Sequence, residues 1–131
     1  MKARREHVIP LPFQAVKMLR TLQGLTGHRQ HLFPGRDNPL GPMTSHSLRQ
    51  LLKSLGWSGI YSPHATRTTG STRLNEMGYR PDAIEAQLAH ADTNNVRRTY
   101  NHATYLDERK VMMQAWSDYL DSLCCCHPSR W

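Results

Sequence analysis

Four side chains of this sequence have the types and the spacing to attack a phosphate diester. His64 and Arg67 lie three residues apart in P-H-A-T-R, so on a helix they share one face and can reach one ligand. Arginine matches two phosphate oxygens, and histidine can donate or accept a proton near neutral pH. His90 follows in L-A-H. Tyr100 follows in R-R-T-Y as a candidate nucleophile, which needs positive neighbours or a base because the pKa of free tyrosine is about 10.

Each of these residues also has a simpler structural explanation. His64 and Arg67 can be a surface pair, and His90 can be a hydrogen-bonded core or helix-capping histidine. Tyr100 can be half-buried packing, and Tyr105 is a rival five residues later. Only the ordered combination favours phosphoryl transfer.

Helices are expected to position these side chains. Apolar spacing and turn signals predict helices at residues 12 to 24 or 27, 45–55, 63–77, 81–90 and 107–123. Thr44 or Ser45 can cap the second of these, and Gly56 and Gly78 can end the second and third. Residues 27–42 carry turn signals and are expected to form a loop.

Two further expectations concern the ends of the chain. Residues 3–11 contain His7-Val8-Ile9 and predict one β-strand, while Tyr100 is expected on a brief helical turn. The last helix is expected to pack through one apolar stripe, which consists of Leu106, Met113, Trp116, Leu120 and Leu123.

The charge of the chain favours a polyanionic partner. Its 131 residues carry 17 Lys and Arg against 10 Asp and Glu, a formal net charge of +7. The first 60 residues hold nine basic and two acidic side chains, and the remainder holds eight of each. Binding to nucleic acid through this field would weaken with salt. A basic protein without such a partner is the alternative.

Composition also restricts location and metal chemistry. We expect a cytoplasmic protein without a signal peptide or membrane span, because prolines interrupt the N-terminal segment. Cys124–Cys126 are consecutive, unlike a disulfide framework or a spaced zinc site, and are expected to lie in a disordered tail. His28 and His31 have no further ligands at the usual spacings.

The ordered residues resemble those of the tyrosine recombinase (phage integrase) family. H-x-x-R, L-A-H and the tyrosine occur in the order of that family, and K-A-R-R-E-H-V-I-P-L resembles the end of its β-hairpin. Two further stretches resemble integrases of satellite phages and genomic islands. They are G-Y-R-P-D-A-I-E-A-Q-L-A-H-A and Y-N-H-A-T-Y-L-D-E-R-K-V-M-M-Q-A-W-S-D-Y-L. The similarity extends from Lys2 to about Leu123.

The resemblance implies a mainly α fold with a remnant N-terminal strand or hairpin, and a site-specific recombinase that needs no cofactor and no metal. Tyr100 would attack the scissile phosphate to give a 3′-phosphotyrosine. Arg67 would hold the phosphate, His64 and His90 would hydrogen-bond it and manage the tyrosine proton, and Lys2 would protonate the leaving oxygen. The basic residues that we expect to contact double-stranded DNA are Arg4, Arg5, Arg97 and Arg98.

The resemblance also implies that parts of the family's pattern are missing. Residues 1–123 correspond to a truncated catalytic domain without the first arginine box and the core-binding domain, followed by a Cys-rich tail at 124–131. Loss of one phosphate-binding arginine is expected to leave the chain weakly active or inactive. The N-terminal strand would have little to pair with unless another chain supplies an edge. Ala65-Thr66 departs from the family's usual residues, so packing beneath Arg67 is expected to differ.

Three hypotheses follow. The first is an enzyme domain from a prophage integrase, which self-associates or joins full-length integrase on DNA, with no membrane and no small-molecule substrate. The second is an inactive DNA-binding remnant or a regulator of full-length integrase. The third is a helical interaction protein in which the histidine, arginine and tyrosine are structural.

Overall fold

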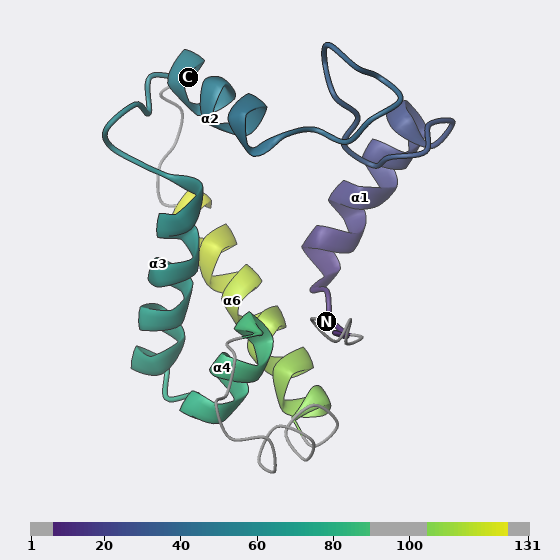
Figure 1. Ribbon diagram of the computed structural model, residues 1–131. Helices are drawn as coiled ribbons and strands as arrows, with labels where there is room; N and C mark the ends of the chain where they lie inside the picture. Colours follow the sequence, from purple (N-terminus) through teal and green to yellow (C-terminus); the bar gives the residue numbers. More distant parts are fainter. Residues whose placement is uncertain (1–6, 90–104, 126–131) are drawn as a thin grey trace, which may run out of the picture. The chain divides into compact units, whose positions relative to one another are not determined.

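The computed structural model describes residues 7–89 and 105–125, and this part of the chain is helical (Figure 1). Its helices are α1 (Phe13–Thr26), α2 (Ser45–Ser54), α3 (Pro63–Glu76), α4 (Pro81–Leu88) and α6 (Leu106–Cys125). The mainly α fold class is confirmed, and these helices lie close to the expected bounds. The expectation of a disordered tail from Cys124 is wrong for its first two residues, because α6 continues through Cys125. The turn expected at Tyr100 lies outside the described residues.

Local capping explains where the helices begin and end. The hydroxyl of Thr44 accepts a hydrogen bond from the Ser47 N–H at 3.2 Å, so Thr44 is the N-cap of α2. Gly56 and Gly78 follow α2 and α3 with φ of 81° and 85°, a backbone conformation that favours glycine. Pro81 occupies the first turn of α4, where its missing N–H costs nothing.

The chain divides into two compact units. The first unit, which we call the C-terminal unit, comprises Met1–Phe13 and Gly70–Trp131. The second unit, which we call the 14–69 unit, comprises Gln14–Thr69. Helix α3 runs through the boundary, with its first half in the 14–69 unit and its second half in the C-terminal unit.

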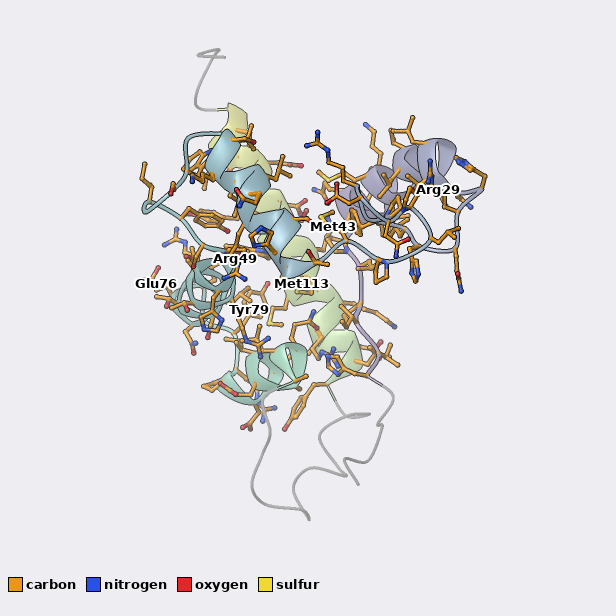
Figure 2. All side chains as sticks on the ribbon, turned by 45° about the horizontal axis from the view of Figure 1, so that its top comes forward. Arg29, Met43, Arg49, Glu76, Tyr79 and Met113 are labelled. Atoms are coloured by element: carbon orange, nitrogen blue, oxygen red, sulfur yellow. The ribbon has the colours of Figure 1, made fainter. Side chains whose placement is uncertain are left out.

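The C-terminal unit contains the hydrophobic core of the described residues. Its buried members come from α3, α4 and α6 and are Leu74, Ala83, Ile84 and Met112. The partly buried side chains packed against them are Tyr79, Leu88, Tyr105, Met113 and Trp116; Tyr79 and Met113 are labelled in Figure 2. The second half of α3 lies beside α6, where a Cβ on Gly70 would come within 3.9 Å of the Trp116 ring (Figure 1).

The core-facing side of α6 differs from the expected stripe. Met113 and Trp116 do pack against the core, but Leu120 and Leu123 are 41% and 49% exposed. Met112, which the stripe omitted, is fully buried, and so is Arg109. The buried face therefore runs through positions 109, 112 and 116, and one of its members is a charged residue that an apolar pattern cannot reveal.

The 14–69 unit has no buried residue. Its helices α1 and α2 leave large apolar side chains exposed, including Met18 at 69% and Leu51 at 50%. Residues 27–44 form the expected loop, which is closed by an isolated bridge between Pro34 and Pro42. Hydrogen bonds at 2.8 Å from Gly35 N to Gly41 O and from Met43 N to Phe33 O hold this loop together.

The expectation of an N-terminal strand is wrong for the described part of it. Residues 7–12 form no strand, and residues 1–6 lie outside the described part of the chain. The carbonyl of Val8 accepts a hydrogen bond from the Arg109 side chain at 2.6 Å, and His7 Nε2 lies 3.3 Å from the Gln87 carbonyl. The hydrogen-bond partners of residues 7 and 8 are thus a side chain and a carbonyl of the C-terminal unit, and not the backbone of a neighbouring strand.

Candidate active site and basic pocket

Helix α3 places His64 and Arg67 on one face at its N-terminal end. Pro63 is the first residue of the helix, and the Ser62 hydroxyl accepts a hydrogen bond from the Ala65 N–H at 3.2 Å. The helix therefore begins in a capped turn that fixes the backbone at both residues. The His64 side chain is exposed and that of Arg67 is half-buried. An exposed imidazole one turn from a guanidinium can bind one anionic oxygen group jointly.

Thr66, which lies between His64 and Arg67, has a partner in the preceding loop. Its hydroxyl forms a hydrogen bond with the Tyr61 hydroxyl. This contact joins the first turns of α3 to the loop that precedes the helix.

A pocket of about 370 Å³ opens between α2 and the loop that leads into α3. Arg49 and Lys53 line it from α2, with His46 one turn earlier on the same side; Arg49 is labelled in Figure 2. Among the described residues that line it, none carries a carboxylate. Since two permanent cations face the pocket without a lining acid, it favours anions.

Aromatic side chains also line this pocket. Trp57 and Tyr61 meet edge to face, with ring centroids 6.3 Å apart and an interplanar angle of 72°. They remain 39% and 38% exposed, so their rings are accessible to a ligand. Cations next to accessible aromatic rings are typical of surfaces that bind nucleic acid, because the cations contact phosphates and the rings contact sugars or bases.

Sequence reasoning missed this basic pocket. It assigned DNA contacts to Arg4, Arg5, Arg97 and Arg98, all of which lie outside the described residues. A signal was present, because His46, Arg49, Gln50 and Lys53 follow the i, i+3, i+4, i+7 spacing of one helix face. The leucines of the same segment predict a helix with an apolar face, and this polar stripe lies beside them. The prediction rested on the leucines and assigned no role to the polar stripe.

The remaining candidate catalytic residues, Lys2, His90 and Tyr100, also lie outside the described residues. The structure does describe the chain directly before His90. Helix α4 ends at the C-cap residue Ala89, which has a left-handed φ of 51° and directly precedes His90. Of the predicted catalytic set, the described residues include His64 and Arg67, and the structure places these two on one face of α3.

The rival tyrosine has a structural role. Tyr105 packs against the core of the C-terminal unit, and the Arg80 guanidinium carbon lies 5.0 Å from the centroid of its ring. Arg80 Nη2 also donates to the Tyr105 hydroxyl at 3.4 Å. A half-buried ring held by packing and by a cation accounts for Tyr105 without chemistry.

Neither a metal centre nor a membrane segment is found in the described part of the chain. Over residues 7–89 and 105–125, no three His, Cys, Asp or Glu side chains come together to hold a metal ion. None of the described helices combines the length and the apolar character needed to cross a membrane.

The class of protein defined so far is a mainly helical one, with a capped H-x-x-R turn and a basic, aromatic pocket that favours anions. Comparison with known proteins narrows this class. Residues 1–107 match the sequence profile described as the phage integrase family. The chain belongs to this family, the tyrosine recombinases.

Curated relatives show the same membership. The chain is 45% identical over 118 residues to prophage integrase IntA of Escherichia coli (strain K12), covering 90% of this chain and 29% of the relative. It is 42% identical over 122 residues to the integrase of Shigella phage Sf6, covering 92% of this chain and 32% of the relative. It is 39% identical over 125 residues to the integrase of Enterobacteria phage P4, covering 92% of this chain and 28% of the relative.

The chain thus spans about 30% of the length of these relatives. No solved structure matches it.

Proposed function

We propose that this chain is the catalytic part of a prophage integrase that cuts and rejoins double-stranded DNA. The observation that carries the proposal is the capped first turn of α3, which holds His64 and Arg67 on one face in a member of the integrase family. Residues 1–125, up to the end of α6, would form the catalytic domain, and residues 126–131 would follow it. Self-association, or association with full-length integrase, would occur on the DNA.

In this proposal Tyr100 is the nucleophile. Its oxygen forms a bond to the scissile phosphorus while the bond from phosphorus to the 5′-oxygen breaks. The proton of the phenol passes to a histidine, and Lys2 gives a proton to the leaving 5′-oxygen. The product is a 3′-phosphotyrosine and a free 5′-hydroxyl. Attack by the 5′-hydroxyl of another strand reverses the step and releases the tyrosine.

Arg67 and His64 would stabilise the phosphate through this exchange. The guanidinium can donate two parallel hydrogen bonds to the non-bridging oxygens, where negative charge develops in the transition state. The half-buried position of Arg67 limits its hydration and strengthens this interaction. His64, exposed on the same face, can reach the same oxygens or the tyrosine proton.

The basic pocket would hold DNA beside the scissile phosphate. Arg49 and Lys53 supply charge to the backbone, and Trp57 and Tyr61 supply contact area. All of these belong to the 14–69 unit, as do His64 and Arg67. Such phosphate contacts would add affinity without reading base sequence.

Strand cleavage can be tested without knowledge of the attachment site. A pool of nicked duplexes with randomised arms loses a short 5′-hydroxyl fragment on cleavage, so the covalent adduct cannot reverse and accumulates even when the rate is low. We expect the chain to form an adduct that survives denaturation, and Arg67→Lys to form it at least about 10²-fold more slowly. Arg29→Lys, a conservative change in the loop at 27–44, is the control.

Two outcomes would overturn the catalytic proposal. An adduct whose rate is unchanged in Arg67→Lys would show that Arg67 does not act on the phosphate. Salt-sensitive DNA binding without any adduct would indicate a DNA-binding remnant or regulator.

A further inference from the structure

Arg109 is the largest fully buried side chain of the described residues. It lies near the start of α6 on the core-facing side, and only 1% of it is exposed. Burial lowers the pKa of its guanidinium, yet arginine keeps its charge in proteins. A buried charge is costly unless hydrogen bonds compensate it, so its retention at this position needs a reason.

Two neutral oxygens receive the hydrogen bonds of this guanidinium. Arg109 Nε donates to Gln87 Oε1 at 2.9 Å, and Nη2 donates to the Val8 carbonyl at 2.6 Å. The ion pairs seen in the described part of the chain do not include Arg109. The planar guanidinium therefore acts as a rigid connector that holds two other segments at fixed angles. We call Val8, Gln87 and Arg109 the Arg109 junction.

The junction joins segments that are far apart in sequence. Val8 and Gln87 lie 101 and 22 residues from Arg109. His7 Nε2 lies 3.3 Å from the Gln87 carbonyl, and the Phe13 N–H donates to Gln114 Oε1 of α6 at 2.9 Å. Residues 7–13 are thus attached to α4 and α6 at three points, all within the C-terminal unit.

The chain leaving the junction leads to three residues of the proposed active site. Lys2 lies six residues before Val8, so its Cα lies within about 20 Å of that carbonyl even in a fully extended chain. His90 lies three residues after Gln87, and α6 begins six residues after Tyr100. The junction therefore fixes the described ends from which the chain continues to these three residues.

We propose that Arg109 is a positioning residue for strand cleavage, which holds residues 7–13, the segment that follows Lys2, against α4, the helix that precedes His90. This inference rests on the proposed recombinase function. Arg109 does not touch DNA in this account. Its effect passes through the Val8 carbonyl to Lys2, the group that would protonate the leaving 5′-oxygen.

The leaving group offers a readout specific to that role. When sulfur replaces the bridging 5′-oxygen, the leaving thiol has a pKa of about 8.5 and departs as a thiolate without a proton donor. Loss of Lys2, or of its correct placement, should therefore slow cleavage of the oxygen substrate and leave the sulfur substrate nearly unaffected. A general loss of folding would slow both equally.

The experiment compares adduct formation on nicked duplexes with 5′-oxygen and 5′-sulfur leaving groups, using the full chain. We expect Arg109→Lys to slow the oxygen substrate by about 10- to 100-fold and the sulfur substrate by less than about threefold, as Lys2→Ala should. Gln87→Met, which removes one acceptor and leaves the Val8 contact, should show a smaller effect of the same kind. It keeps the test informative if Arg109→Lys does not fold.

Arg73→Lys is the matched control, because Arg73 is an arginine of the same unit that pairs with Glu76 away from the junction. It should leave both rates unchanged. Equal slowing of the two substrates in the Arg109 and Gln87 variants, or no slowing in either, would overturn the positioning role. A wild-type chain that forms no adduct with either substrate would instead overturn the recombinase function, and the positioning role with it.

Discussion

The hydroxyl of Thr66, between His64 and Arg67 on α3, shares a hydrogen bond with the hydroxyl of Tyr61 from the wall of the basic pocket. The pair links the turn that carries the candidate catalytic residues to the loop that carries the aromatic rings. Because both groups lie in an exposed part of the 14–69 unit, we expect the link to orient the loop more than to stabilise the fold.

A double-mutant cycle tests this link. Thr66→Val and Tyr61→Phe each remove one hydroxyl and retain the shape of the side chain. Each should lower the free energy of unfolding by about 1 kcal/mol or less, and the double variant should lose no more than the larger single loss. Chemical denaturation measures all three. Strictly additive losses would show that the two hydroxyls are not coupled.

The basic pocket should contribute to DNA affinity through charge. Replacing Arg49 and Lys53 by Gln removes two cations from its wall. We expect the slope of log affinity against log salt to become shallower by about 0.9 for each phosphate that the variant no longer neutralises. Fluorescence anisotropy with a duplex at several salt concentrations measures the slope.

A matched variant separates this pocket from general charge. Arg29→Gln with Arg36→Gln removes the same net charge from the loop at 27–44 of the same unit. If the two double variants change the slope equally, the pocket has no special part in binding.

The core of the C-terminal unit should depend on Met112 and not on the end of the expected stripe. Met112 is fully buried, so Met112→Ala should cost about 2–5 kcal/mol of unfolding free energy. Leu120 is 41% exposed, so Leu120→Ala should cost about 1 kcal/mol or less. Thermal and chemical unfolding measure both losses. A larger loss of unfolding free energy in Leu120→Ala than in Met112→Ala would contradict this packing.

Local chemistry accounts for what the sequence predicted well. The cap at Thr44, the turns at Gly56 and Gly78 and the proline start of α3 depend on neighbouring residues, so those helix ends were predictable. The shared face of His64 and Arg67 follows from helix geometry alone.

Long-range contacts account for what the sequence could not give. The N-terminal strand was predicted from β-branched residues, but the partner of Val8 is a side chain 101 residues away. The buried face of α6 includes Arg109, whose acceptors come from two other segments. The basic pocket needs the path of the loop after Trp57, which no periodicity encodes.

The start of α6 should show a pH effect of known sign. Lys110 Nζ donates to Asp107 Oδ1 at 2.8 Å, and this hydrogen bond and the ammonium charge hold the pKa of Asp107 below its usual value. A carboxyl group whose pKa is lowered by folding adds stability above its unfolded pKa of about 3.9, and this stability is lost as the pH falls through the folded pKa.

Lys110→Met should therefore return the Asp107 pKa upward and reduce the stability that is lost as the pH falls below about 3.9. Carboxyl titration by NMR reports the first effect, and thermal unfolding above and below that pH reports the second. An Asp107 pKa that does not rise in Lys110→Met would contradict this assignment.

The central claim is that Tyr100 forms the covalent bond to DNA, and the most direct measurement is to identify the residue that carries the DNA. Adduct trapped on nicked duplexes would be digested with nuclease and protease, and the phosphorylated peptide sequenced by mass spectrometry. We predict phosphate on Tyr100, adduct formation abolished in Tyr100→Phe, and adduct retained in Tyr105→Phe. Phosphate on Tyr105 or on any other residue, or an adduct that persists in Tyr100→Phe, would contradict the account.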